Sequence, residues 1–239
     1  MTDVRRCVEC DHENPPKTRF CDQCGASLYS NKVRAFALIE GTAGVGKSTL
    51  ANRLVHNYMK RTPYINTLLH LGQSHTYAPL DPDNINASFT AEDHVNYLEQ
   101  IYDTLSFLSQ PPGLIPQPKL ACIIETLHLT LAVRPGLLSQ PQILAYDQRL
   151  AALGCKLIFI KVSPESHWER CIWERRNNGF ITKYGAKYGR NLEEIHSYYV
   201  AEQRRLLELF EYSSMQKLLV DGESSPETLA EIAFDFWVS

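Results

Sequence analysis

The most constraining feature of the chain is a glycine-rich segment between a β-type run at 33–39 and a helix-forming stretch at 48–60. It reads GTAGVGKS from Gly41 to Ser48 and matches the GxxxxGK[ST] phosphate-binding loop at every fixed position. Glycines let consecutive backbone N–H groups surround phosphate oxygens, and the N-terminus of the following helix adds a favourable dipole. The segment therefore predicts a site for the phosphates of ATP. A glycine turn with a solvated lysine is the alternative interpretation.

Each residue type in this loop has a predicted task. Lys47 reaches the β- and γ-phosphates and is a predicted catalytic residue, and the Ser48 hydroxyl can ligate Mg²⁺. The predicted ATP-binding residues are Gly41, Thr42, Ala43, Gly44, Val45, Gly46, Lys47, Ser48 and Thr49.

Four of the seven cysteines lie near the N-terminus as two CxxC pairs, Cys7 with Cys10 and Cys21 with Cys24. Four thiolates at this spacing suit a closed tetrahedral Zn²⁺ site, and a segment this short needs the metal for most of its folding energy. We predict a structural zinc ribbon at 1–29; two disulfides and a catalytic thiol pair are the alternatives. The segment resembles the zinc-ribbon modules at the ends of many prokaryotic proteins. The other cysteines, Cys122, Cys155 and Cys171, lie in apolar or helical patterns and are expected to be buried and unreactive.

Charge and composition limit the kinds of partner that we expect for the protein. The formal net charge is −3, and residues 1–28 carry four Lys or Arg against five Asp or Glu, so nucleic acid is not an expected partner. The ribbon is instead expected to act as a structural cap or to dock a protein partner. Because the first residues, MTDVRRCVEC, lack an apolar core of signal-peptide length and no run is long enough to span a bilayer, we expect a cytoplasmic protein without a membrane partner.

Downstream of the loop, apolar runs alternate with helical patterns. Further strands are predicted at 66–71, 120–125, 156–162 and 217–220, and helices at 90–109, 142–153, from 163, 191–211 and 225–237. This order is typical of an α/β fold with a five-stranded, doubly wound parallel sheet, here extending over 33–239. In such sheets ligands gather at the carboxyl ends of the strands, so chemistry is expected there.

Two segments near these strand ends carry candidate residues. Gln73 and Tyr77 follow the second strand and are predicted to contact a phosphate acceptor, with an ordinary loop as the alternative. Glu125 ends the third strand within reach of Mg²⁺ or of an acceptor hydroxyl, or it caps the next turn. His128 is a candidate acceptor contact or a packing histidine.

A basic segment at 168–190 carries six Lys or Arg against two Glu. Such a segment can close over a transferring phosphate, neutralise charge and exclude water, so we predict a lid. Arg170, Arg175 and Arg176 are its predicted catalytic residues; a solvated helix face with a loose loop is the alternative.

The order of these motifs resembles the thymidylate-kinase-like branch of P-loop kinases. LIEGTAGVGKST at 38–49 is similar to that branch's EGxDGxGKST opening, and VSPE at 162–165, followed by the arginines, is similar to its lid entry. LVDG at 219–222 with SPE at 225–227 is similar to its last strand and helix. The resemblance implies a five-stranded parallel sheet and transfer of the ATP γ-phosphate to a nucleoside or nucleoside monophosphate.

Three acceptor-side positions depart from the branch. Ala43 stands where an acidic residue is usual, Glu125-Thr126 replaces an Asp-Arg pair, and the segment at 73–76 is also altered. The donor side therefore predicts ATP and Mg²⁺, while two other functions stay open. One is a nucleotide-dependent switch or ATPase that signals to a partner through the zinc ribbon. The other is a kinase for a small molecule that is not a nucleotide.

Overall fold

A five-stranded parallel sheet forms the centre of the protein. The computed structural model describes residues 5–7, 10–15, 18, 21–25, 34–61, 66–72, 91–109, 119–133, 138–177 and 188–238. The strands lie in the order β4-β5-β3-β6-β7, and each neighbouring pair is parallel. Their bounds are β3 Arg34–Glu40, β4 Asn66–Leu71, β5 Lys119–Glu125, β6 Cys155–Lys161 and β7 Gln216–Asp221. The predicted fold class is confirmed.

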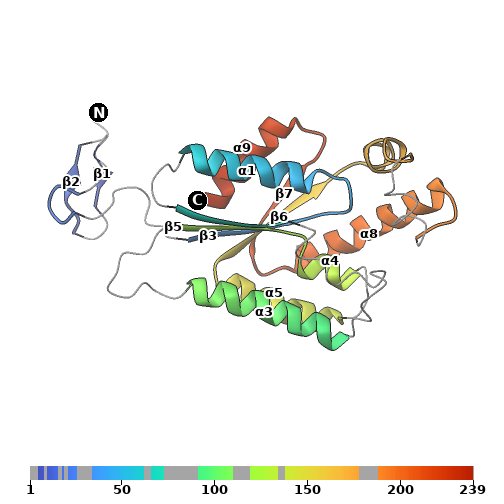
Figure 1. Ribbon diagram of the computed structural model, residues 1–239, viewed down its shortest axis with the longest axis horizontal. Coiled ribbons are helices and arrows are strands. Elements are labelled where there is room, and N and C mark those ends of the chain that lie inside the picture. Colours follow the sequence, from blue (N-terminus) through green and yellow to red (C-terminus); the bar gives the residue numbers. More distant parts are fainter. Residues whose placement is uncertain are drawn as a thin grey trace.

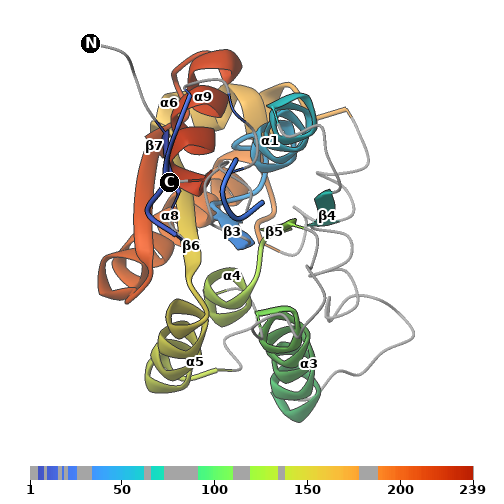
Figure 2. The same cartoon turned by 90° about the vertical axis from the view of Figure 1, so that its left-hand side faces the viewer.

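Helices cover both faces of the sheet, as Figures 1 and 2 show. On one face lie α1 (Lys47–Arg61) and α9 (Pro226–Val238), which pack against each other. The opposite face carries α3, α4, α5 and the C-terminal part of α8. These helices span Ala91–Ser109, His128–Val133, Gln140–Ala152 and Leu192–Tyr212.

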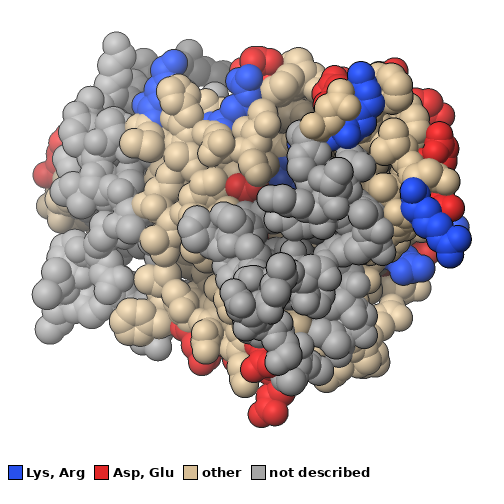
Figure 3. Space-filling view, turned by 45° about the vertical axis from the view of Figure 1, so that its right-hand side comes forward, with Lys and Arg blue, Asp and Glu red and all other residues tan. Residues whose placement is uncertain are grey.

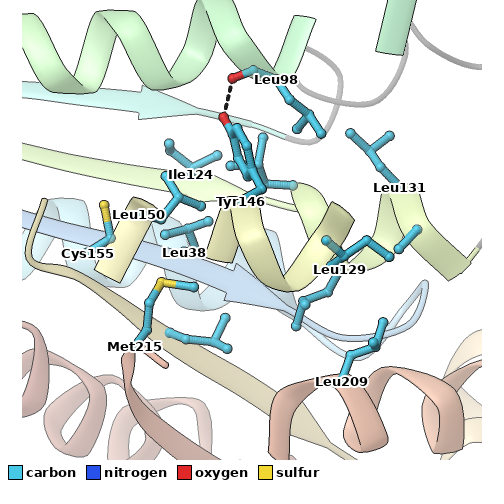
Figure 4. Close-up of a cluster of buried hydrophobic side chains, with 14 of the residues drawn as sticks. Leu38, Leu98, Ile124, Leu129, Leu131, Tyr146, Leu150, Cys155, Leu209 and Met215 are labelled. Atoms are coloured by element: carbon cyan, nitrogen blue, oxygen red, sulfur yellow. Dashed lines mark hydrogen bonds between the residues drawn. The ribbon is translucent and has the colours of Figure 1, made fainter. Parts of the chain in front are cut away.

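Alternation along the strands produces two separate cores. In β3, Ala37 and Ile39 face the α1/α9 core, whereas Phe36 and Leu38 face the other core. Successive side chains of a strand point to opposite faces, so a fully buried strand is apolar on both sides. The larger core is drawn in Figure 4, where the Tyr146 hydroxyl donates to the Leu98 carbonyl and so joins α5 to α3.

The predicted helix starts agree with the observed caps. Ser163, Asn191 and Ser225 accept hydrogen bonds from the backbone N–H groups of Ser166, Glu194 and Thr228. The helix that follows Ser163, α6 (Pro164–His167), continues directly into the π-helix η2 (Trp168–Trp173). The short helix α4 was not predicted, because six residues with five of them buried show no amphipathic stripe.

The N-terminal segment forms a small unit of its own. Strands β1 (Arg5–Arg6) and β2 (Glu13–Asn14) pair antiparallel. The predicted domain boundary, between 29 and 33, lies outside the described residues. Among the described helices, none is long and apolar enough to cross a membrane.

Candidate phosphotransfer site

The loop between β3 and α1 has the backbone geometry that its glycines predict. Gly41, Gly44 and Gly46 have φ values of 142°, 82° and 101°, a region that other residues rarely adopt. A Cβ on Gly44 would lie 2.5 Å from the Cys171 sulfur, and one on Gly41 would lie 2.9 Å from the Ile160 carbonyl oxygen. Gly41 and Gly44 are therefore needed both for the conformation of the loop and for its close packing against β6 and η2, whereas Gly46 is needed for conformation alone.

Lys47 begins helix α1 and turns back over the loop. Its Nζ donates to the carbonyl oxygens of Gly41 at 2.8 Å and Thr42 at 2.7 Å, and the side chain is buried. The loop's own carbonyls thus hold the ammonium group at the place where phosphate oxygens would compete for it. The first turn of α1 carries no acidic residue, so its N-terminus favours an anion.

Glu125, at the end of β5, lies beside the loop. Ser48 Oγ donates to Glu125 Oε2 at 2.5 Å, which joins the predicted Mg²⁺ ligand to the predicted strand-end carboxylate. The other oxygen, Oε1, lies 2.7 Å from Nε2 of His70 on β4. Thr126, directly after Glu125, has φ = 63°, and its N–H donates to the Ile39 carbonyl at 3.0 Å. A strained residue held by its neighbours at this place is typical of a functional site.

A second carboxylate, Glu40, holds the start of α4. Glu40 is fully buried at the end of β3, and its two oxygens accept from Leu127 N–H at 2.9 Å and Thr130 Oγ1 at 2.6 Å. The first bond satisfies a backbone donor that the N-terminus of α4 leaves unpaired, and the second pairs a buried hydroxyl. The sequence analysis missed this role, although the strand alternation that points Leu38 to the α4 side also points Glu40 there.

A cavity of about 370 Å³ adjoins the loop on its other side. Its walls come from the loop and α1, from η2 with the following turn, and from the β7–α9 connection. The lining residues are Gly44, Val45, Gly46, Thr49, Leu50, Arg170, Glu174, Arg175, Gly222, Ser224, Pro226 and Leu229. Two of the three predicted lid arginines thus lie at the cavity, as do residues near Gly222 that the sequence analysis had not selected.

The three lid arginines differ in their placement. Arg170 donates to the Gly222 carbonyl at 2.6 Å and so joins η2 to the end of β7. Arg175 lines the cavity, whereas Arg176 is exposed and stacks on Trp173, its Cζ 3.9 Å from the ring centre. The rest of the predicted lid from 178 to 187 lies outside the described residues. Figure 3 shows described Lys and Arg side chains beside Asp and Glu along the upper and right-hand edges of this view.

The acceptor-side predictions concern Gln73, Tyr77 and His128. Gln73 and Tyr77 lie outside the described residues. His128 is fully buried at the start of α4, where its Nε2 lies 3.1 Å from Asp147 Oδ2. Burial alone would raise the pKa of Asp147, but hydrogen bonds from His128 and Ser213 outweigh it and lower that pKa. In the structure His128 packs as a partner of Asp147, as in the alternative stated above, and its contact with an acceptor stays a prediction.

Behind the phosphate loop, Ala43 packs into an apolar cluster with Ile172, Ile195 and Tyr199. His167 at the end of α6 is buried beside this cluster, its ring centre 5.5 Å from that of Tyr199. Burial lowers the pKa of His167 to about 4, and the charges of His196, Lys47 and Arg175 act in the same direction. The aromatic wall behind the loop therefore holds a neutral imidazole at neutral pH.

The four N-terminal cysteines come together as predicted. Their sulfur atoms all lie within 4.8 Å of one another, with Cys7 and Cys24 3.6 Å apart and Cys10 and Cys21 3.5 Å apart. Thiolates bound tetrahedrally to Zn²⁺ at about 2.3 Å stand about 3.8 Å apart, so the cluster fits that ion. Asp11 and Gly25 follow the two CxxC turns with φ of 59° and 73°. Buried Asn14 braces the pair of turns by accepting from Asp22 N–H at 2.9 Å.

The remaining cysteines, Cys122, Cys155 and Cys171, are buried, as expected. Burial raises the pKa of the first two thiols to about 12 and that of Cys171 to about 11, so all three are protonated at neutral pH.

Comparison with solved structures finds proteins that align over most of this chain. The YorR protein of Bacillus subtilis, solved in complex with phosphorylated GDP, aligns over 84% of this chain and 94% of its own, with a TM-score of 0.51 and 14% identity. A sugar kinase from Janibacter sp. HTCC2649 aligns over 86% and 94% (TM-score 0.47, 15% identity), and a gluconokinase from Sinorhizobium meliloti 1021 over 85% and 91% (0.44, 12%). No protein-family model and no curated protein matches the sequence. The likeness to YorR concerns the fold.

Proposed function

We propose that the protein is an ATP- and Mg²⁺-dependent phosphotransferase. The observation that supports this function is a group of features at the carboxyl ends of the strands. They are a glycine loop with positive φ values, Lys47 turned onto this loop, and Ser48 hydrogen-bonded to Glu125. A cavity lined by this loop and by two arginines adjoins it. Each part matches a task in phosphoryl transfer, which depends on positioning and on charge stabilisation.

On the donor side, the loop's N–H groups and the α1 N-terminus would hold the β- and γ-phosphates. Lys47 would exchange the carbonyls of Gly41 and Thr42 for phosphate oxygens. The cavity beside the loop is large enough for the base and ribose of ATP, and Arg170 and Arg175 in its wall would neutralise charge as the phosphoryl group moves. Arg176 would join them only by leaving Trp173.

Ser48 and Glu125 together fit a magnesium site. Mg²⁺ prefers hard oxygen ligands and keeps several waters, and the Ser48 hydroxyl with the Glu125 carboxylate offers such oxygens beside the phosphate loop. When bound, the ion would offset the negative charge of the phosphates. Glu125 would orient the ion directly or through water, and Ser48 would bind it.

For the acceptor, we propose a nucleoside or nucleoside monophosphate, on the resemblance to thymidylate-kinase-like enzymes. YorR was solved with a phosphorylated guanine nucleotide, which agrees with a nucleotide at a fold of this kind. Gln73 and Tyr77 remain the predicted acceptor contacts, and 168–190 the predicted lid. Because Ala43 and Thr126 replace the acidic residue and the arginine of that branch, the acceptor need not be thymidylate.

The proposal is tested with γ-labelled ATP, Mg²⁺ and a panel of nucleosides, nucleoside monophosphates, sugars and other small alcohols. We expect label to reach a nucleoside or nucleotide faster than it reaches water. Transfer only to a sugar or alcohol would keep the phosphotransferase and replace the acceptor. Slow hydrolysis without transfer, together with nucleotide-dependent binding of a protein partner, would instead identify a switch.

We further propose that Cys7, Cys10, Cys21 and Cys24 hold one structural Zn²⁺. Elemental analysis of the purified chain should find one zinc per molecule, and Cys21→Ser should lose it. A Cys122→Ser variant is the matched control, because that thiol is buried in the sheet domain. Zinc retained by Cys21→Ser at full occupancy would contradict the proposal.

A further inference from the structure

His70 meets Glu125 because of the pleat and register of two adjacent strands. In β4, Leu69 and Leu71 face the larger core, so His70 points to the opposite face, where α1 lies. On β5, Glu125 also points to the α1 face, two residues beyond Ile123, which pairs with His70. The two side chains are therefore diagonal neighbours on one face of the sheet, within reach of each other.

The resulting contacts link Ser48, Glu125 and His70 in a row at the carboxyl ends of the strands. Ser48 from α1 donates to one oxygen of Glu125 at 2.5 Å, and the other oxygen lies 2.7 Å from His70 Nε2. The Glu125 side chain is 2% exposed and the His70 side chain 27% exposed. Because a carboxylate accepts, Nε2 carries the hydrogen. Both oxygens are thus held at once, which fixes the orientation of a buried carboxylate.

We propose that His70 is the positioning residue of the magnesium site: it holds Glu125 in the orientation that serves Ser48 and the ion. This inference rests on the proposed phosphotransferase function and names a residue outside the phosphate-loop motif. Groups that orient a metal-binding carboxylate typically contribute 10- to 100-fold to metal affinity or activity. Without His70, a buried Glu125 oxygen loses the contact with Nε2, and the side chain is less firmly held toward Ser48.

Two variants of His70 separate this role from simple packing. In His70→Gln the side-chain amide nitrogen lies about as far from the backbone as Nε2, so it can still donate to Glu125. In His70→Asn the amide is one carbon shorter and falls short of that position. His56→Gln, at an exposed position of α1, is the matched control for the loss of a histidine.

The measurement is calorimetric binding of ADP, first in EDTA and then at increasing Mg²⁺. For His70→Asn we expect the Mg²⁺ concentration that gives half of the metal-dependent gain in affinity to rise about tenfold. ADP affinity in EDTA should change less than about twofold, because His70 lies away from the nucleotide pocket lining. For His70→Gln and His56→Gln this Mg²⁺ concentration should stay near the wild-type value. At a fixed Mg²⁺ concentration, kcat should fall in His70→Asn and stay near the wild-type value in the other two variants.

Each result decides something. If His70→Asn needs no more Mg²⁺ than the wild type, or if it loses ADP affinity equally in EDTA, His70 is not a positioning residue of the metal site. An equal defect in His70→Gln would also overturn the role, since that variant keeps the donor. If the wild type binds ADP identically with and without Mg²⁺, the proposed function itself fails. That failure is separate from any behaviour of the His70 variants.

Discussion

Two adjoining corners of the site, both at the carboxyl ends of the strands, are built in different ways. The phosphate loop at 41–48 comes from one continuous stretch and is held by backbone conformation: positive φ at its glycines and Lys47 on its own carbonyls. The second corner, where β5 meets α4, is held by side chains from separate segments. Ser48 and His70 hold Glu125, and Glu40 holds the start of α4. A motif of fixed spacing describes the first corner, whereas the second exists only once the strands lie side by side.

The largest effect should come from the first corner. Lys47→Ala removes the ammonium group that we expect to contact the phosphates, so phosphoryl transfer should fall on the order of 10³-fold or more, equivalent to about 4 kcal/mol. The chain should still fold, because the positive φ values belong to the glycines, but the loss of both Lys47 bonds should lower the free energy of unfolding by about 1 kcal/mol. Steady-state kinetics with denaturant unfolding checks both, and Lys60→Ala, at an exposed position of α1, is the control. Transfer at the wild-type rate would mean that the loop does not act on phosphate.

A substitution of Glu40 in the second corner should instead lower the free energy of unfolding. Glu40→Ala leaves the donors at Leu127 and Thr130 buried and unpaired, at about 1–3 kcal/mol each, so we expect a loss of about 3 kcal/mol in the free energy of unfolding. Glu40→Gln keeps one acceptor oxygen and should lose about 1 kcal/mol. The chain's tryptophans, Trp168, Trp173 and Trp237, all lie in the sheet domain, so urea unfolding followed by their fluorescence reports on that domain. Equal stability of the two variants would show that the carboxylate does not hold this corner.

The wall behind the phosphate loop should make stability depend on pH. Burial lowers the pKa of His167 to about 4 in the folded chain, below the ordinary value of 6.5. Between these values the unfolded chain binds a proton that the folded chain does not, so stability is complete above pH 6.5 and falls as the pH falls. At pH 5 the loss attributable to His167 is about 2 kcal/mol.

His167→Phe fills the same aromatic site without titrating. Urea unfolding at pH 7 and pH 5 should show a difference smaller by about 2 kcal/mol in this variant than in the wild type. His56→Gln, at an exposed position, should keep the wild-type difference. An unchanged pH dependence in His167→Phe would place the titrating group elsewhere.

The sequence predicted the fold closely, for a physical reason. Strands buried on both faces and helices with capping residues are local signals, and the predicted second strand coincides with β4 at Asn66–Leu71. The phosphate loop is also local, since its glycines determine its conformation. Other signals were too short to detect, such as the six buried residues of α4 or the π-helical turns of η2.

The second corner escaped prediction because its partners are distant in sequence. Glu125 was selected for its place at a strand end, but His70 lies inside the preceding strand and is singled out only by the register that places it beside Ile123. The same applies to Glu40, which precedes the loop glycines and turns away from them toward α4. His128 lies three residues after a strand-end carboxylate, a reasonable place for a contact, and only the fold shows that α4 places it in the core beside Asp147.

The smallest expected effect concerns the backbone strain at this corner. Thr126 has φ = 63°, a conformation that costs a residue with a Cβ about 1–2 kcal/mol and glycine almost nothing. Thr126→Gly and Thr126→Ala both remove the buried side chain, so their difference isolates the backbone. After allowance for the greater freedom of glycine in the unfolded chain, Thr126→Gly should be more stable than Thr126→Ala by about 1 kcal/mol. If urea unfolding finds Thr126→Ala the more stable, the left-handed turn is not imposed on the folded chain, and the second corner is held by its side chains alone.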